Sequence, residues 1–115
     1  MVDRLARALA RFIALCPFVQ SIHDLATKQR VVLEGGYILD LYFNETLGKY
    51  GYTLVHGSRR IIGWDNASHH PGLANFPHHF HREDGAVVSS LLTGNPKQDI
   101  EHVVADLNRF LDSHL

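Results

Sequence analysis

The apolar positions of the chain follow two different periods, and the change between them predicts the order of elements. Near the N-terminus they recur every three or four residues, as in an amphipathic helix over residues 2–15: Val2, Leu5, Leu9, Phe12 and Ile13. Pro17 is expected to end this helix, because proline cannot donate the backbone hydrogen bond that a helix interior needs. A second short helix over residues 18–28 is predicted from Val19, Ile22 and Leu25.

The middle of the chain is rich in β-branched and aromatic residues, which favour strands. Four strands are predicted, over residues 30–33, 37–43, 50–56 and 59–65. Glu34-Gly35-Gly36 separates the first two strands, and the two-residue connection Gly57-Ser58 separates the last two. Connections this short join antiparallel neighbours, so the strands are expected to form a meander.

A Pro- and Gly-containing loop follows over residues 67–77, and residues 78–83 are predicted to return as a fifth strand. Side chains alternate between the faces of a strand, so His79 and His81 would share one face and His78 and Phe80 the other. After a linker over residues 89–96, a continuous apolar stripe predicts a C-terminal helix over residues 97–114.

The predicted fold class is α+β: an antiparallel meander of four to five strands, with the N-terminal helices and the amphipathic C-terminal helix on one face. We expect a single domain over residues 1–115, because 115 residues fit one core. Its expected parts are an N-terminal helical extension (1–28), a sheet with a His-rich loop (30–84) and the final helix (97–114).

Composition narrows the function classes. A formal net charge of −1 argues against a protein that coats nucleic acid through a broad basic face. The single cysteine, Cys16, cannot form an intramolecular disulfide, which favours a cytoplasmic location. The apolar run around Cys16 is too short to span a membrane, so neither a membrane segment nor a targeting segment is predicted.

Histidine is the compositional anomaly. The chain has nine histidines, and five of them fall within thirteen residues: His69, His70, His78, His79 and His81. Clustered imidazoles repel one another once several are protonated, so chance explains the cluster poorly.

One interpretation is acid–base cleavage of RNA. One histidine would remove a proton from a ribose 2′-hydroxyl and another would protonate the leaving oxygen. The catalytic candidates are His69, His70, His79, His81 and Asp65. The candidates for binding the phosphate and the substrate are Arg59, Arg60, Arg82 and Asn66. This chemistry requires no cofactor.

Two other interpretations stay open. In a metal site, His78, His79 and His81, with Asp65 as a further donor, would bind a transition metal such as zinc, although no His-Glu-x-x-His or cysteine motif is present. The protein would then be a non-enzymatic module that binds a metal or a protein partner. In a structural role, the histidines would instead hydrogen-bond the backbone of the long loop.

A longer motif runs through this region: Trp64-Asp65-Asn66, then His69-His70-Pro71, then Phe76-Pro77-His78-His79-Phe80-His81. With it, the sequence from about residue 30 onward resembles the TumE-like toxin family. Members of that family are short α+β proteins with the same order of strand, His-His-Pro loop and Phe-Pro-His-His-x-His segment.

The resemblance implies the toxin of a toxin–antitoxin pair, with a cognate DNA-binding antitoxin as partner. It assigns no catalytic role to individual residues. Together with the acid–base chemistry of the histidines, this role leads us to expect a toxin that acts as a small ribonuclease, with RNA as its substrate. We expect no membrane partner, and we expect a homodimer as one form of the protein. The N-terminal extension and Arg82-Glu83-Asp84 depart from the family pattern without touching the motif.

Overall fold

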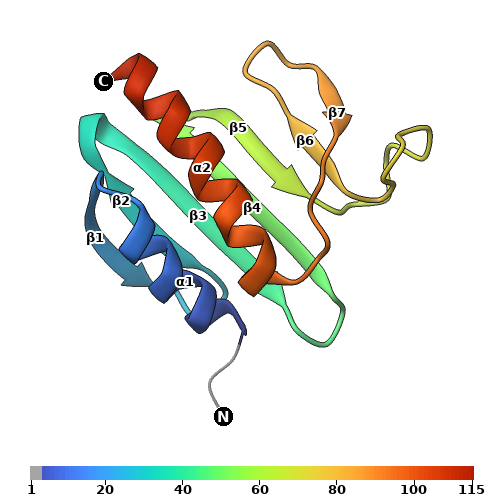
Figure 1. Cartoon of the computed structure of the whole chain (residues 1–115), viewed down its shortest axis with the longest axis horizontal. Helices are drawn as coiled ribbons and strands as arrows, with labels where there is room; N and C mark the ends of the chain where they lie inside the picture. Colours follow the sequence, from blue (N-terminus) through green and yellow to red (C-terminus); the bar gives the residue numbers. More distant parts are fainter. Residues whose placement is uncertain (1–3) are drawn as a thin grey trace.

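The computed structural model describes residues 4–115 and shows one antiparallel sheet with two helices (Figure 1). The helices are α1 (Arg4–Leu15) and α2 (Pro96–His114), and a single 3₁₀ turn, η1 (Glu34–Gly36), connects two strands. The strands are β1 (Val19–Asp24), β2 (Gln29–Leu33), β3 (Tyr37–Asn44), β4 (Lys49–His56), β5 (Arg59–Asp65), β6 (His79–His81) and β7 (Val87–Ser89). They lie side by side in chain order, each antiparallel to the next, as expected for a meander.

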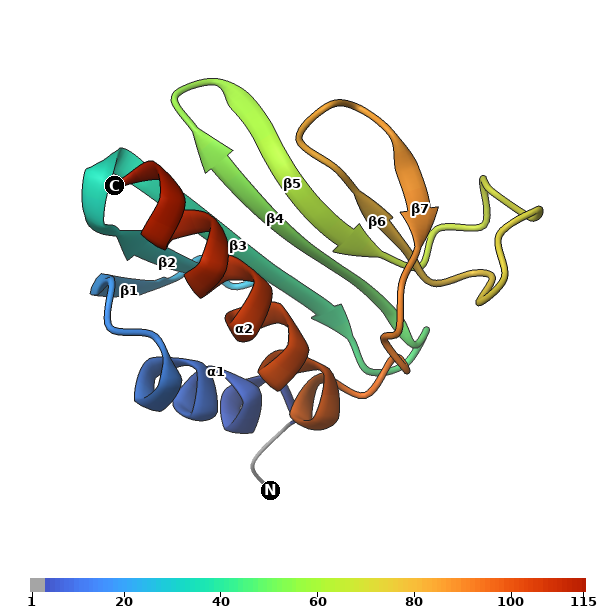
Figure 2. The same ribbon diagram turned by 45° about the horizontal axis from the view of Figure 1, so that its top comes forward.

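Both helices cover the same face of the sheet, as predicted, and Figure 2 shows α1 and α2 side by side beneath it. The core lies between the layers. From the helices it takes Phe12 and the α2 residues Ile100, Val103, Leu107 and Leu111. From the sheet it takes Val31, Leu33, Leu39, Leu41, Tyr52, Leu54 and Trp64. The alternate residues of the strands point to the other face.

The predicted second helix over residues 18–28 is wrong, because this segment forms β1. The helix-like spacing of Val19 and Ile22 has a different cause. The pairing of β1 with β2 shifts register between Val19 and Ser21, which marks a β-bulge. An extra residue in a bulge lets two residues three apart point to the same face of a sheet. Val19 and Ile22 therefore both face the core, opposite Leu33 and Val31.

The sheet has seven strands instead of the four to five predicted. β1 is one of the additional strands, and β7 is the other. β7 contains three residues, so no alternating pattern distinguishes it in the sequence. It pairs with β6 through Phe80 and Val88 and begins just before the predicted linker.

The two predicted terminal helices are present. α1 ends at Leu15, two residues before Pro17; Val2 of the predicted helix lies outside the described residues. α2 begins with Pro96, and the Asn95 side chain caps it by accepting a hydrogen bond from the Lys97 N–H. Proline is favoured in the first helical turn, where its missing N–H costs nothing.

The second face of the sheet carries no helix in residues 4–115 (Figure 2). The cross-strand row Arg30, Asp40, Thr53, Gly63 and His81 runs across it from β2 to β6. We call this surface the uncovered face. Within the described part of the chain, neither helix has the length and apolar character needed to span a bilayer.

Candidate functional site

The candidate site forms where β5 pairs with β6 on the uncovered face. Asp65 ends β5 and is the direct cross-strand partner of His79, while His81 lies two residues further along β6 on the same face. The intervening residues Trp64 and Phe80 point to the helix-covered face, where their ring centroids are 5.1 Å apart. The alternation predicted for His79 and His81 is confirmed, and it brings both of them to Asp65.

One carboxylate joins the two histidines. Asp65 Oδ1 lies 2.8 Å from His79 Nε2, and Asp65 Oδ2 lies 3.0 Å from His81 Nε2. The two Nε2 atoms are 3.1 Å apart. Main-chain groups fix this arrangement: His79 Nδ1 lies 3.0 Å from the Pro77 carbonyl oxygen, and the Ala67 N–H donates to Asp65 Oδ1. We call Asp65, His79 and His81 the Asp-His-His cluster.

The loop over residues 66–78 shields the cluster from solvent. The side chain of His79 is 2% exposed, that of His81 16% and that of Asp65 24%. The ring of His70, from this loop, lies against both histidines, with its centroid 4.8 Å from that of His79 and 6.2 Å from that of His81. His70 therefore stands between the cluster and the solvent.

Arg60 is the cationic side chain beside the cluster. Its Nη2 lies 3.4 Å from His81 Nδ1. Burial lowers the pKa of His81, the positive charge of Arg60 lowers it further, and Asp65 opposes the shift. Gly63 is the cross-strand partner of His81, and a Cβ at Gly63 would be in ordinary contact, at 3.7 Å, with Arg60 Cδ.

His78 is separated from His79 and His81, although all three were predicted as metal ligands. Its Nδ1 lies 2.9 Å from the Tyr50 hydroxyl oxygen, and the two rings stack with centroids 5.8 Å apart. Burial raises the pKa of Tyr50, so its hydroxyl stays protonated, and it is hydrogen-bonded to His78 Nδ1. The group whose donor atoms could hold a metal ion contains Asp65 in place of His78.

The other two predicted arginines lie away from the cluster. Arg59 is exposed at the start of β5, where it pairs with His56 at the far end of the strand from Asp65. Arg82 follows β6 and forms an exposed ion pair of 2.8 Å with Asp84. Of the three arginines, Arg60 alone has a contact with the cluster among residues 4–115.

Asn66 and His69 flank the cluster. The Asn66 side chain accepts a hydrogen bond from the Tyr50 N–H and donates one to the Gly48 carbonyl oxygen. Its amide therefore fastens the loop to the β3–β4 turn. His69 is exposed and lines, together with Asn66 and Lys49, a cavity of about 640 Å³.

The sequence interpretation missed two contributors to the site. Gly63 is a glycine within a strand, a signal that often marks a close approach of another group, and here that group is the Tyr52 carbonyl oxygen, 3.3 Å from where a Cβ would lie. The Pro77 carbonyl that bonds His79 has no sequence signal, because its direction depends on the path of the loop.

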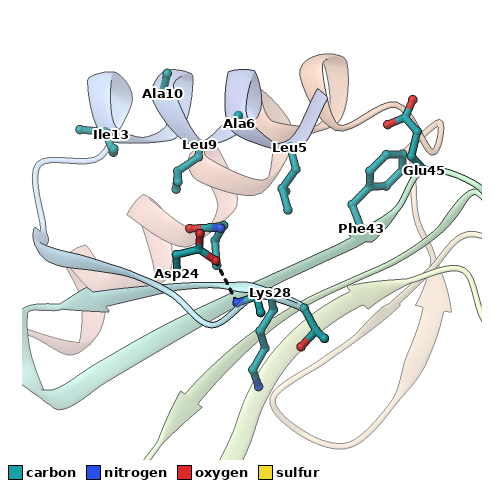
Figure 3. A pocket seen from close by; sticks show the side chains of 12 residues that line it. Leu5, Ala6, Leu9, Ala10, Ile13, Asp24, Lys28, Phe43 and Glu45 are labelled. Carbon is teal, nitrogen blue, oxygen red and sulfur yellow. Dashed lines mark hydrogen bonds between the residues drawn. The ribbon is translucent and has the colours of Figure 1, made fainter. Parts of the chain in front are cut away.

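A second cavity, of about 530 Å³, lies between α1 and the β1–β2 hairpin, on other elements than those that carry the Asp-His-His cluster. Figure 3 shows Leu5 and Leu9 reaching from α1 into this cavity, towards the hairpin that carries Asp24 and Lys28. Its lining contains no histidine, so we do not include it in the candidate site.

Comparison with protein families gives a match over most of the chain. The family model described as Toxin TumE matches residues 9–113. The match includes most of α1 and all of β1, whereas the sequence motif covered only the part from about residue 30. Comparisons with curated proteins and with solved structures give no match.

Proposed function

The chain belongs to the TumE family of toxins, and from this premise we propose that it is toxic because it cleaves RNA at the histidines of the uncovered face. One observation carries the proposal: His70 stands over the Asp-His-His cluster, with Arg60 beside it, on a face that no helix of residues 4–115 covers. A nucleic-acid backbone could approach imidazole and guanidinium groups there together.

In the proposed reaction the ribose 2′-oxygen attacks the neighbouring phosphorus while one imidazole takes its proton. A second imidazole protonates the departing 5′-oxygen. We assign these steps to His70, whose ring lies against the cluster, and to His69, which is exposed on the same loop. Arg60 would hold the phosphate and stabilise the charge that builds up on its oxygens.

The Asp-His-His cluster has a positioning role in this proposal. His79 is 2% exposed and therefore does not reach a substrate, and its ring supports that of His70 at 4.8 Å. We propose that the Asp-His-His cluster, which is itself fixed by main-chain hydrogen bonds, holds the ring of His70 in one orientation. Positioning of this kind lowers the entropic cost of reaching the reactive geometry.

The test is RNA cleavage by the untagged protein. His70→Ala should lower the cleavage rate by about 100-fold or more, the usual contribution of a general acid or base. His102→Ala is the matched control, since His102 is exposed on α2 and lies outside the site. Equal rates for wild type and His70→Ala would contradict the assignment. Absence of cleavage of free and of ribosome-bound RNA would end the ribonuclease proposal.

Membership of a toxin family also suggests an antitoxin partner. We propose that this partner is the small DNA-binding protein expected from the sequence, and that its co-expression restores growth to cells that make the toxin. Growth arrest that persists in its presence would contradict this pairing. Homodimer formation stays a prediction, and size-exclusion chromatography of the purified toxin checks it.

A further inference from the structure

The Asp-His-His cluster contains more hydrogen-bond acceptors than its protons can satisfy. His79 Nδ1 faces the Pro77 carbonyl oxygen, so Nδ1 carries the proton and Nε2 of the neutral ring has only a lone pair. That lone pair lies 2.8 Å from Asp65 Oδ1, which is also an acceptor and already receives the Ala67 N–H. Two acceptors at this distance repel each other unless a second ring proton or a metal ion lies between them.

The second histidine does not remove this conflict. His81 Nδ1 faces the Arg60 guanidinium, which only donates, so the proton of the neutral His81 ring is on Nε2. This single proton lies between Asp65 Oδ2 at 3.0 Å and His79 Nε2 at 3.1 Å. It cannot also serve the contact between Asp65 Oδ1 and His79 Nε2.

The spacing of the three donor atoms fits a metal ion. Zinc–nitrogen and zinc–oxygen bonds of about 2.0–2.1 Å in tetrahedral geometry place neighbouring ligand atoms roughly 3.3 Å apart. Asp65 Oδ1 lies 2.8 Å from His79 Nε2, Asp65 Oδ2 lies 3.0 Å from His81 Nε2, and the two Nε2 atoms are 3.1 Å apart. With one donor atom taken from each residue, the three atoms lie within 4.8 Å of one another. A small outward shift and a turn of the carboxylate would make room for the ion.

The surroundings also resemble those of metal-binding histidines. Such a histidine usually donates its other ring N–H to a carboxylate or to a backbone carbonyl, which fixes the ring and its tautomer. His79 does so to Pro77, and the Asp65 carboxylate is held by the Ala67 N–H. The low exposure of His79 and His81 means that the ligands are already in place and largely desolvated.

We propose that Asp65, His79 and His81 bind one divalent transition metal ion of the zinc type through the carboxylate and the two Nε2 atoms. Binding at His81 Nε2 would move the proton of this ring to Nδ1, and the exposed Arg60 side chain would turn away from it. Two imidazoles and one carboxylate suit zinc and its neighbours in the first transition row better than magnesium or calcium, which prefer oxygen ligands. Three protein ligands would leave a fourth position, and the ring of His70 lies against both histidine ligands. A site of this kind is open to a water molecule or a phosphate oxygen.

The proposal goes beyond the ribonuclease function and does not depend on it. With the ion bound, His79 and His81 would be ligands and could not transfer protons, in agreement with the assignment of those steps to His69 and His70. The ion would polarise an oxygen bound at its fourth position.

Metal binding should be measured on protein purified without a histidine tag and stripped with EDTA. Titration calorimetry with zinc chloride should show one ion per chain, and cobalt(II) should give the visible absorption typical of tetrahedral nitrogen and oxygen ligands. His81→Ala and Asp65→Asn should each weaken zinc binding by about 100-fold or more, because each removes one of three ligands. Asp65→Asn keeps the size of the side chain and an oxygen for the Ala67 N–H, so it is the variant more certain to fold.

His69→Ala is the matched control for metal binding, since His69 lies on the same loop but outside the cluster. It should bind zinc as the wild type does. Absence of stoichiometric zinc binding, equal affinity in the ligand variants, or loss of binding in His69→Ala would overturn the proposal.

RNA cleavage, measured on the same samples with and without EDTA, separates the two proposals. Zinc binding without cleavage would leave the metal site in place and end the ribonuclease proposal. Cleavage by a protein that binds no zinc would support the ribonuclease proposal and overturn the metal site.

Discussion

At the scale of single residues, two neighbouring tyrosines in the core differ in how their hydroxyls are satisfied. The rings of Tyr50 and Tyr52 stack with centroids 5.0 Å apart. The Tyr50 hydroxyl is 2.9 Å from His78 Nδ1, whereas the Tyr52 hydroxyl has no hydrogen-bond partner among the described residues. Because Tyr52 is 1% exposed, its hydroxyl has lost its water without a replacement.

This difference predicts opposite effects of the same substitution. Tyr52→Phe should leave the free energy of unfolding unchanged or raise it by about 1 kcal/mol, because it removes a buried hydroxyl without a partner. Tyr50→Phe should lower it by about 1 kcal/mol, since it removes the hydrogen-bond partner of His78. Urea unfolding of both variants checks this. A larger loss for Tyr52→Phe than for Tyr50→Phe would show that the hydroxyl of Tyr52 has a partner in solution.

At the scale of elements, the start of α2 depends on a buried carboxylate. Asp99 is 0% exposed, and its oxygens accept hydrogen bonds from the Thr93 N–H, the Thr93 hydroxyl and the Gly94 N–H. The segment from β7 into α2 therefore turns around one side chain. An acidic residue in the first turn also interacts favourably with the helix dipole.

Asp99→Ala should lower the free energy of unfolding by about 2–4 kcal/mol, because it leaves several backbone and side-chain donors without an acceptor. Asp112→Ala, at an exposed position of the same helix, should change it by less than about 0.5 kcal/mol. Thermal or urea unfolding of the two variants gives the comparison. Equal effects would mean that the loop before α2 finds other partners.

Elements with a regular period could be predicted from the sequence, and those with an irregularity could not. β3, β4, β5 and both helices have long apolar patterns that match their geometry. β1 was mistaken for a helix because its bulge places Val19 and Ile22 three residues apart on one face. β7 has three residues and no pattern to detect.

The candidate site, too, could be predicted from the sequence only where the strand pattern is regular. Alternation along β6 placed His79 and His81 together, and the nearness of Asp65 follows from the pairing of β5 with β6. The sequence did not indicate which of Arg59 and Arg60 lies beside the cluster. The answer depends on a register shift between Leu54 and Val55, next to the residues of β4 with which the two arginines pair. Which member of a run of charged residues reaches the site depends on such details of register.

At the scale of the whole molecule, different groups should set the acid and alkaline limits of stability. Burial alone would raise the pKa of Asp40, but hydrogen bonds from Arg30 and Lys28 outweigh this effect and lower it. Burial raises the pKa of Tyr52 above its ordinary value of 10.0. The folded state thus favours ionised Asp40 and neutral Tyr52.

The sign of each effect follows from linkage between protonation and folding. The contribution of Asp40 is complete above its ordinary pKa of 3.8 and should be lost as the pH falls through its lower folded value. The contribution of Tyr52 is complete below pH 10.0 and should be lost as the pH rises beyond it. The check is the free energy of unfolding in urea, measured across the pH range. Asp40→Asn should reduce its fall at acid pH, and Tyr52→Phe should reduce its fall at alkaline pH. Unchanged profiles would contradict the assignments.

The position of α2 after all seven strands has a consequence for synthesis. A ribosome releases the whole sheet before it releases the helix whose Ile100, Val103, Leu107 and Leu111 complete the core. Until then α1 alone covers the apolar side of the sheet, and such nascent intermediates are targets for chaperones and proteases. A message cut before the codons of α2 would yield a chain that the cell degrades. A finished toxin molecule therefore requires translation through the whole of α2.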